Sequence, residues 1–138
     1  AVGLFVAFLT RFAVRRWPPV RALHVEFRAL FGPLTNGEIA LFALFSSVGE
    51  ELFFRGALLP ASGLAISSLL FGLMHLAPKR RLVPWTVSAL VMGFVLGGLF
   101  VLTGDLTAPL VAHFVVNYEN LQFITSYDPA AAVPSRPA

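Results

Sequence analysis

The sequence predicts an all-α fold, a polytopic transmembrane helix bundle of about four full spans with a partial N-terminal helix and an interfacial amphipathic helix. Two observations predict it. Of the 138 residues, 57% are hydrophobic and only 12% are charged, so the chain lacks the polar surface that would cover the core of a soluble domain. Residues 56–78 and 82–104 contain no Asp, Glu, Lys or Arg, and each window exceeds the roughly 20 residues that a helix needs to cross a bilayer.

The same composition excludes several classes of protein. A mean hydropathy of +0.81 rules out a soluble or disordered chain, and no nucleic-acid partner is expected despite a pI near 10.2. The sequence contains no cysteine, which excludes disulfides, iron–sulfur clusters and thiol catalysis. The partner that the composition predicts is therefore the lipid bilayer.

The N-terminal region, residues 1–35, is expected to form a partial membrane helix followed by an amphipathic helix. The apolar segment 1–17 ends in Arg15, Arg16 and Trp17, which are residue types that anchor a helix at a membrane interface. Pro18-Pro19 is expected to stop this helix. In the following segment, 20–31, apolar and basic residues occupy separate helix faces, which is typical of a helix lying along the membrane surface.

Residues 36–125 are expected to contain the four spans. Thr35 and Glu38 have the spacing of a capping box, which marks the start of the first span. Pro60 and the small residues 61–63 allow a turn after it. The predicted spans are 37–59, 61–77, 82–103 and 107–124. Residues 126–138 are expected to be a disordered tail.

Two clusters of basic residues predict the orientation in the membrane. Residues 11–28 contain five arginines, and Lys79, Arg80 and Arg81 form a second cluster. Two spans separate the clusters, so both clusters fall on one side, which the positive-inside rule makes cytoplasmic. The chain is therefore expected to be a multi-pass integral membrane protein with its basic loops in the cytoplasm.

The span 37–59 contains three charged residues near its middle, Glu50, Glu51 and Arg55. An ionisable residue at mid-membrane costs about 2.5–3.5 kcal/mol on insertion scales and indicates a function. Glu51 and Arg55 are four residues apart and can form an ion pair that orients the helix. Glu50 has no partner within its helix. It is expected either to face a polar cavity as a general base or to bond structurally to another helix.

Two further spans contribute polar residues. His75 closes the span 61–77, where it is either an interfacial histidine or part of a site. His113, Asn117 and Asn120 follow one another at i, i+4 and i+7, a stripe that either joins helices by hydrogen bonds or faces a cavity. At 1.5 Å per residue the polar groups of the three spans can converge, although His75 requires a tilted or shifted helix.

This set of side chains fits amide hydrolysis, which needs a base for water and donors for the oxyanion. Glu50 with His75 can activate a water molecule, and His113 with Asn117 can present two donors to one oxygen. Glu50, His75 and His113 are also competent zinc ligands. The sequence contains no HExxH or other short-spaced ligand pair, so no cofactor is expected.

Three motifs carry a resemblance to a known family. The segment Glu50-Glu51-Leu-Phe-Phe-Arg55 resembles the EExxxR motif of the CAAX prenyl protease and bacteriocin-processing family of intramembrane glutamic endopeptidases. Phe71-Gly-Leu-Met-His75 resembles its FxxxH motif, and His113-Phe-Val-Val-Asn117 its HxxxN motif. The resemblance covers roughly residues 37–124.

The resemblance implies an intramembrane endopeptidase in which Glu50 is the water-activating base, assisted by His75. His113 and Asn117 would form the oxyanion hole, and Glu51 and Arg55 would support the site. It implies a membrane-associated, lipidated or secreted peptide substrate and a bacterial plasma membrane, with a metal-independent mechanism favoured. Members of the family have further spans before EExxxR, whereas this sequence has at most part of one.

Two alternatives belong to other functional classes. A non-catalytic membrane interaction protein, such as a bacteriocin self-immunity factor, would use the same helices as a binding surface. A small transporter with Glu50 as its proton site is a third hypothesis, which about four spans support poorly.

Overall fold

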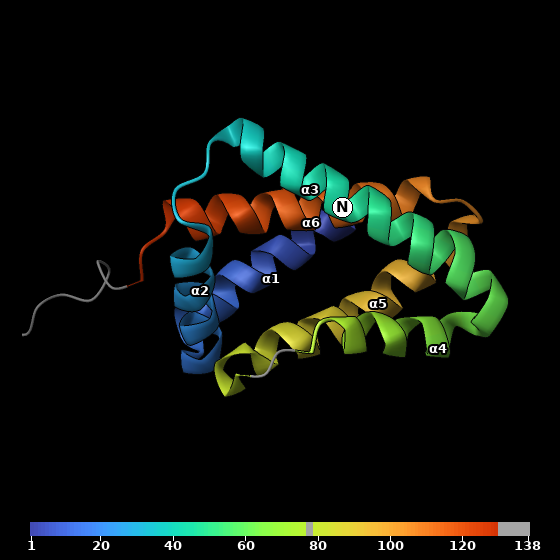
Figure 1. Cartoon of the computed structure of the whole chain (residues 1–138), viewed down its shortest axis with the longest axis horizontal. Helices are drawn as coiled ribbons and strands as arrows, with labels where there is room; N and C mark the ends of the chain where they lie inside the picture. The colour runs from blue at the N-terminus through green and yellow to red at the C-terminus, as the bar shows by residue number, and fades with distance from the viewer. Residues whose placement is uncertain (77–78, 130–138) are drawn as a thin grey trace, which may run out of the picture.

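Helices form almost the whole of the described chain. The computed structural model describes residues 1–76 and 79–129 (Figure 1). No strand occurs in these ranges, which confirms the predicted all-α fold. The helices are α1 (Val2–Arg16), α2 (Pro18–Phe31), α3 (Asn36–Glu51), the π-helix η1 (Leu52–Leu58), α4 (Leu59–Met74), the 3₁₀ turn η2 (Arg80–Leu82), α5 (Val83–Thr103) and α6 (Thr107–Ser126). Most of the predicted disordered tail, 130–138, lies outside the described residues.

The junction between α1 and α2 differs slightly from the prediction. The chain breaks at Trp17, whose backbone is extended (φ −112°, ψ 117°), and Pro18 and Pro19 begin α2. Proline is tolerated in the first turn of a helix because the N–H groups there have no partner in the helix. Arg21 then donates from Nη2 to the carbonyl oxygen of Arg15 at 2.8 Å, which helps to close the end of α1.

The predicted start of α3 and the predicted turn after residue 60 are confirmed. Glu38 N donates to Thr35 Oγ1 at 3.3 Å and Thr35 N donates to Glu38 Oε2 at 2.8 Å, which completes the capping box. The backbone changes direction at Gly63, whose φ of 82° is accessible to glycine but strained for other residues.

The predicted helix over 37–59 is present, but its second half is not a regular α-helix. Leu52 to Leu58 form a π-helix, and the N–H of Leu59 donates to the carbonyl oxygen of Phe54, five residues earlier. Pro60 accounts for part of this irregularity, because its ring crowds the carbonyl four residues before it and it has no N–H. The wider turns contain Phe54 and Arg55, both of which are buried.

The second predicted span is shorter than expected at its end. Helix α4 stops at Met74, and His75 has non-helical backbone angles (φ −101°, ψ 15°). Pro78 cannot donate the N–H that would extend the helix. His75 therefore lies at the junction of α4 and the connection to α5.

The helices pack as two pairs. Figure 1 shows α3 beside α6 and α4 beside α5, with α1 against α6, as the contacts also indicate. The small residues Gly93 and Gly97 are buried against α4. A Cβ atom at Gly93 would lie 2.8 Å from the carbonyl oxygen of Ser68, so only glycine permits this separation. Helix α2 crosses the end of the molecule where the two pairs are furthest apart.

The surface of the described chain is that of a membrane protein. Asn36–Met74 and Arg80–Thr103 are long and apolar enough to cross a membrane, with mean hydropathies of 1.8 and 2.1. Only 28% and 22% of their apolar windows are buried, and many Phe and Leu side chains are exposed. Four full spans remain a prediction, because α6 is not among the segments that meet this criterion.

Candidate active site

Two adjacent carboxylates at the end of α3 have different environments. The side chain of Glu51 is fully buried (0% exposed), whereas that of Glu50 is 29% exposed. Successive residues on a helix point about 100° apart. Glu51 therefore points into the contacts with α5 and α6, and Glu50 is partly open.

Glu51 holds three elements together. Its Oε1 accepts hydrogen bonds from Arg55 Nη1 at 2.8 Å and from His113 Nδ1 at 2.7 Å. The predicted i, i+4 pairing of Glu51 with Arg55 is therefore present, with Arg55 only 1% exposed. Arg55 also donates from Nη2 to the carbonyl oxygen of Gly93 at 3.1 Å, and its guanidinium lies 4.5 Å from the centre of the Phe71 ring. Because each charge is paired, the group can remain buried.

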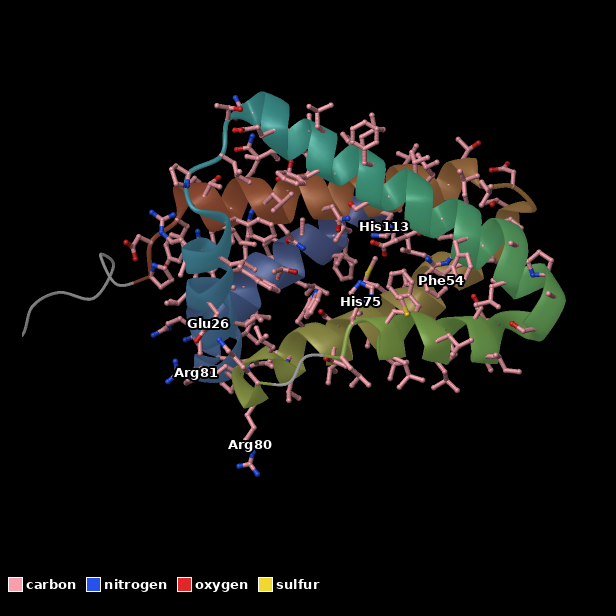
Figure 2. All side chains as sticks on the ribbon, viewed as in Figure 1. Glu26, Phe54, His75, Arg80, Arg81 and His113 are labelled. Carbon is pink, nitrogen blue, oxygen red and sulfur yellow. The ribbon has the colours of Figure 1, made fainter. Side chains whose placement is uncertain are left out.

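Glu50 faces both histidines of the predicted site. Its Oε2 lies 3.8 Å from His75 Nε2 and 4.0 Å from His113 Nε2, and it has no hydrogen-bond partner among the described residues. These separations are longer than direct hydrogen bonds. The side chains come from α3, the end of α4 and α6, so the predicted convergence of three helices occurs. Figure 2 shows His75 and His113 between the two pairs of helices.

Hydrogen bonds orient both imidazole rings in the same sense. His75 Nδ1 is 2.7 Å from the carbonyl oxygen of Phe71, and a carbonyl only accepts, so this nitrogen carries a proton. His113 Nδ1 bonds the Glu51 carboxylate in the same way. In both rings Nε2 is left on the side of Glu50.

Asn117 lies one turn beyond His113 on α6 and contacts a residue that was not predicted as part of the site. Its Nδ2 donates to Ser46 Oγ at 2.9 Å, and Ser46 Oγ donates to the carbonyl oxygen of Ala43 at 3.3 Å. Because the Ser46 hydroxyl uses its proton on Ala43, it accepts from the amide, which fixes the orientation of Asn117. In the sequence, the position of Ser46 one turn before Glu50 indicates that the two side chains lie on the same side of the helix.

Two residues at the start of α5 contact His75 and were also missed. Thr86 Oγ1 donates to the carbonyl oxygen of His75 at 2.7 Å. The Trp85 ring meets the imidazole edge-on with centroids 5.2 Å apart. The sequence indicated Trp85 only as an aromatic residue near a helix start.

The residues considered as zinc ligands face one another at the distances given above. Among the described residues, however, no group of three or more His, Asp or Glu side chains is arranged so that it could hold a metal ion.

Comparison with known proteins adds an independent observation. Residues 33–118 match the family described as "Type II CAAX prenyl endopeptidase Rce1-like". A relative in Bacillus subtilis (strain 168), "Uncharacterized protein YpbD", is 29% identical over 116 residues, which cover 81% of this chain and 60% of the relative. The chain thus spans less than two thirds of that relative's length. No solved structure matches the chain. All six predicted site residues fall in the matched region, whereas α1 and α2 precede it.

Proposed function

Because the chain belongs to the Rce1-like family of type II CAAX prenyl endopeptidases, we propose that it is an intramembrane endopeptidase that hydrolyses a peptide bond in a membrane-associated protein or peptide. The observation that carries this proposal is the position of Glu50. Its unpartnered Oε2 faces two imidazole rings from other helices. The neighbouring Glu51 is fully buried, and its Oε1 is bound to Arg55 and His113, although its Oε2 also has no hydrogen-bond partner among the described residues.

Glu50 is the general base in this proposal. It takes a proton from a water molecule, assisted by His75, as the water oxygen attacks the carbonyl carbon of the scissile bond. The protonated Glu50 then returns this proton to the leaving nitrogen as the C–N bond breaks. General acid–base catalysis of this kind contributes about 10²–10⁴-fold to a rate.

His113 and Asn117 are the oxyanion donors. The Nδ1 proton of His113 is used on Glu51, so Nε2 donates only when the ring carries a second proton. Asn117 has a second amide hydrogen besides the one bound to Ser46. One oxyanion donor is worth about 2.7–4 kcal/mol.

The helix lengths and charges support a proposed arrangement in the membrane. Asn36–Met74 has 39 residues, and its reversal at Gly63 leaves a first part long enough to cross the hydrocarbon core and a return segment, residues 64–74, of about 17 Å. In this proposal α5 and α6 each cross once. Arg81 pairs with Glu26 at 3.1 Å, which joins the two regions with basic clusters at one end, as a shared cytoplasmic face requires. The membrane is the bacterial plasma membrane.

A cleavage assay tests this function. The chain is reconstituted in phospholipid vesicles and incubated with fluorogenic peptides, each prepared with and without a C-terminal prenyl group. Glu50→Gln is expected to lower cleavage at least 10²-fold while the protein still accumulates in the membrane. Asp105→Asn is the matched control, because an amide oxygen can still accept the 2.7 Å bond from Thr107 N.

Several outcomes discriminate the alternatives. Cleavage by the Glu50→Gln variant at the rate of the parent chain would contradict the assignment. Loss of activity with a strong chelator, restored by zinc, would favour the metal mechanism with Glu50, His75 and His113. A role as a non-catalytic interaction protein predicts that His75→Ala and His113→Ala leave protection from a bacteriocin intact.

A further inference from the structure

Helix α2 lies outside the region that matches the family, yet it contacts both pairs of helices. It crosses the end of the bundle at which the α3–α6 and α4–α5 pairs are furthest apart (Figure 1). The two pairs hold different parts of the proposed site. Glu50 and His113 belong to the α3–α6 pair, and His75 belongs to the α4–α5 pair.

One side of α2 is fixed to the end of α6. His24 is buried (3% exposed), its Nε2 lies 2.9 Å from the carbonyl oxygen of Tyr127, and its ring packs against Phe123. Arg28 donates from Nη1 to the carbonyl oxygens of Ile124 and Thr125 at 2.9 and 2.6 Å. These carbonyls at the helix end have no partner within α6, so the guanidinium satisfies them.

The other contacts of α2 reach the start of α5. The Phe27 ring meets Trp85 edge-on with centroids 5.5 Å apart, and Trp85 in turn contacts His75. Glu26 pairs with Arg81 nearby (Figure 2), but the Arg81 side chain is 72% exposed, so this pair contributes little. The aromatic contacts therefore carry the connection from α2 to His75.

The position of His75 makes this connection important. Helix α4 leaves the turn at Gly63 and reaches His75 twelve residues later, about 18 Å away. Helices α3 and α4 are joined through η1. Helix α3 packs mainly against α6, and helix α4 packs mainly against α5. A rotation of about 5° at the turn would therefore move His75 by about 1.5 Å relative to Glu50, and a displacement of 1 Å can cost 10²-fold in rate.

We propose that α2 clamps the two pairs of helices together, and that Phe27 and Trp85 are positioning residues that hold His75 at its working distance from Glu50. This inference rests on the proposed function, because the working distance has meaning only for the catalytic pair. Whether α2 holds His75 in place can be tested without measuring activity.

The test uses the two tryptophans of the chain. In Trp17→Phe the emission reports Trp85 alone, and an imidazole in contact with an indole ring alters that emission. At constant pH the emission is therefore expected to change in His75→Gln, which removes the ring that contacts Trp85. This His75-dependent difference in emission reports whether His75 remains beside Trp85.

Phe27→Ala in this background is expected to lose at least half of the His75-dependent difference in Trp85 emission and to reduce kcat about tenfold with little change in KM. Phe27→Tyr keeps the ring and is expected to restore both. Phe8→Ala is the matched control, because Phe8 is 62% exposed on α1, and it should leave both unchanged. Measurements of helicity and of accumulation in the membrane test whether the Phe27→Ala chain is folded. If it is not, Phe27→Leu is the second variant.

An unchanged His75-dependent difference in Trp85 emission in Phe27→Ala and Phe27→Leu would overturn the clamp, whatever the activity. A parent chain that cleaves no peptide would count against the proposed function, while the fluorescence measurements would still decide whether α2 positions His75.

Discussion

Glu50 and Glu51 are neighbours in the sequence, yet they belong to regions of opposite character. The anchoring network of Glu51, Arg55, His113 and Gly93 is buried, and each of its charged side chains is paired with another element. The open pair of Glu50 and His75 is partly exposed and lacks a direct hydrogen bond between its members. A carboxylate inside a membrane protein can therefore stabilise the contacts between helices or act as a reactive group. Which of the two roles it has depends on the side chains that it contacts.

The largest effect on stability is expected where the anchoring network is broken. Glu51→Gln leaves the buried Arg55 without its counter-charge, which should destabilise the fold by about 3–5 kcal/mol. Glu50→Gln should change the free energy of unfolding by less than about 0.5 kcal/mol, because Glu50 Oε2 has no hydrogen-bond partner to lose. Unfolding in mixed micelles measures both.

A control variant sharpens this contrast. Replacing the pair together, with Glu51→Gln and Arg55→Met, should recover part of the lost stability because no unpaired charge remains. Equal destabilisation by the Glu50 and Glu51 variants would remove the distinction between the two regions.

A smaller effect, on activity, is expected at Asn117. Asn117→Ala removes a proposed oxyanion donor and should lower kcat about 10²–10³-fold. Ser46→Ala keeps the donor but loses the 2.9 Å bond that orients it, so we expect a loss of about tenfold. Steady-state kinetics on the same peptide measure both variants. A larger loss for Ser46→Ala than for Asn117→Ala would show that Asn117 is not the group on which Ser46 acts.

The smallest effect concerns His24, which lies in neither region. Burial lowers the pKa of His24 below its ordinary value of 6.5. The hydrogen bond to the Tyr127 carbonyl raises this pKa, and the positive charge of Arg28 lowers it further. As the pH falls below 6.5, the unfolded chain binds a proton that the folded chain does not, so stability should decrease. Thermal unfolding between pH 7.5 and 5 measures this, and His24→Gln should flatten the dependence. If the pH dependence of thermal unfolding were unchanged in His24→Gln, a group other than His24 would be its cause.

Much of the fold could be predicted because the signals are local. The Thr35–Glu38 capping box and the turn at Gly63 each depend on residue type within one or two turns of helix. The membrane family was likewise predicted from three short motifs, and the match over residues 33–118 confirms it. The roles of the individual site residues stay predictions.

The irregular parts of the fold were not predictable in the same way. The π-helix over Leu52–Leu58 departs from the regular period that helix prediction assumes. The side chains around the site were missed because their partners are distant in the sequence: Ser46 meets Asn117 on another helix, and Trp85 meets Phe27. Residue spacing along one helix carries no information about such pairs.

By itself, the sequence determined that this chain forms apolar helices, where most of them begin and end, and that Glu51 can pair with Arg55, because hydrophobicity, capping and i, i+4 spacing act over a few residues. Only the tertiary structure decided that Glu50 faces His75 and His113, and that α2 joins the two pairs of helices. These arrangements depend on how whole helices pack, and packing is set by the shapes of all the contacting surfaces together.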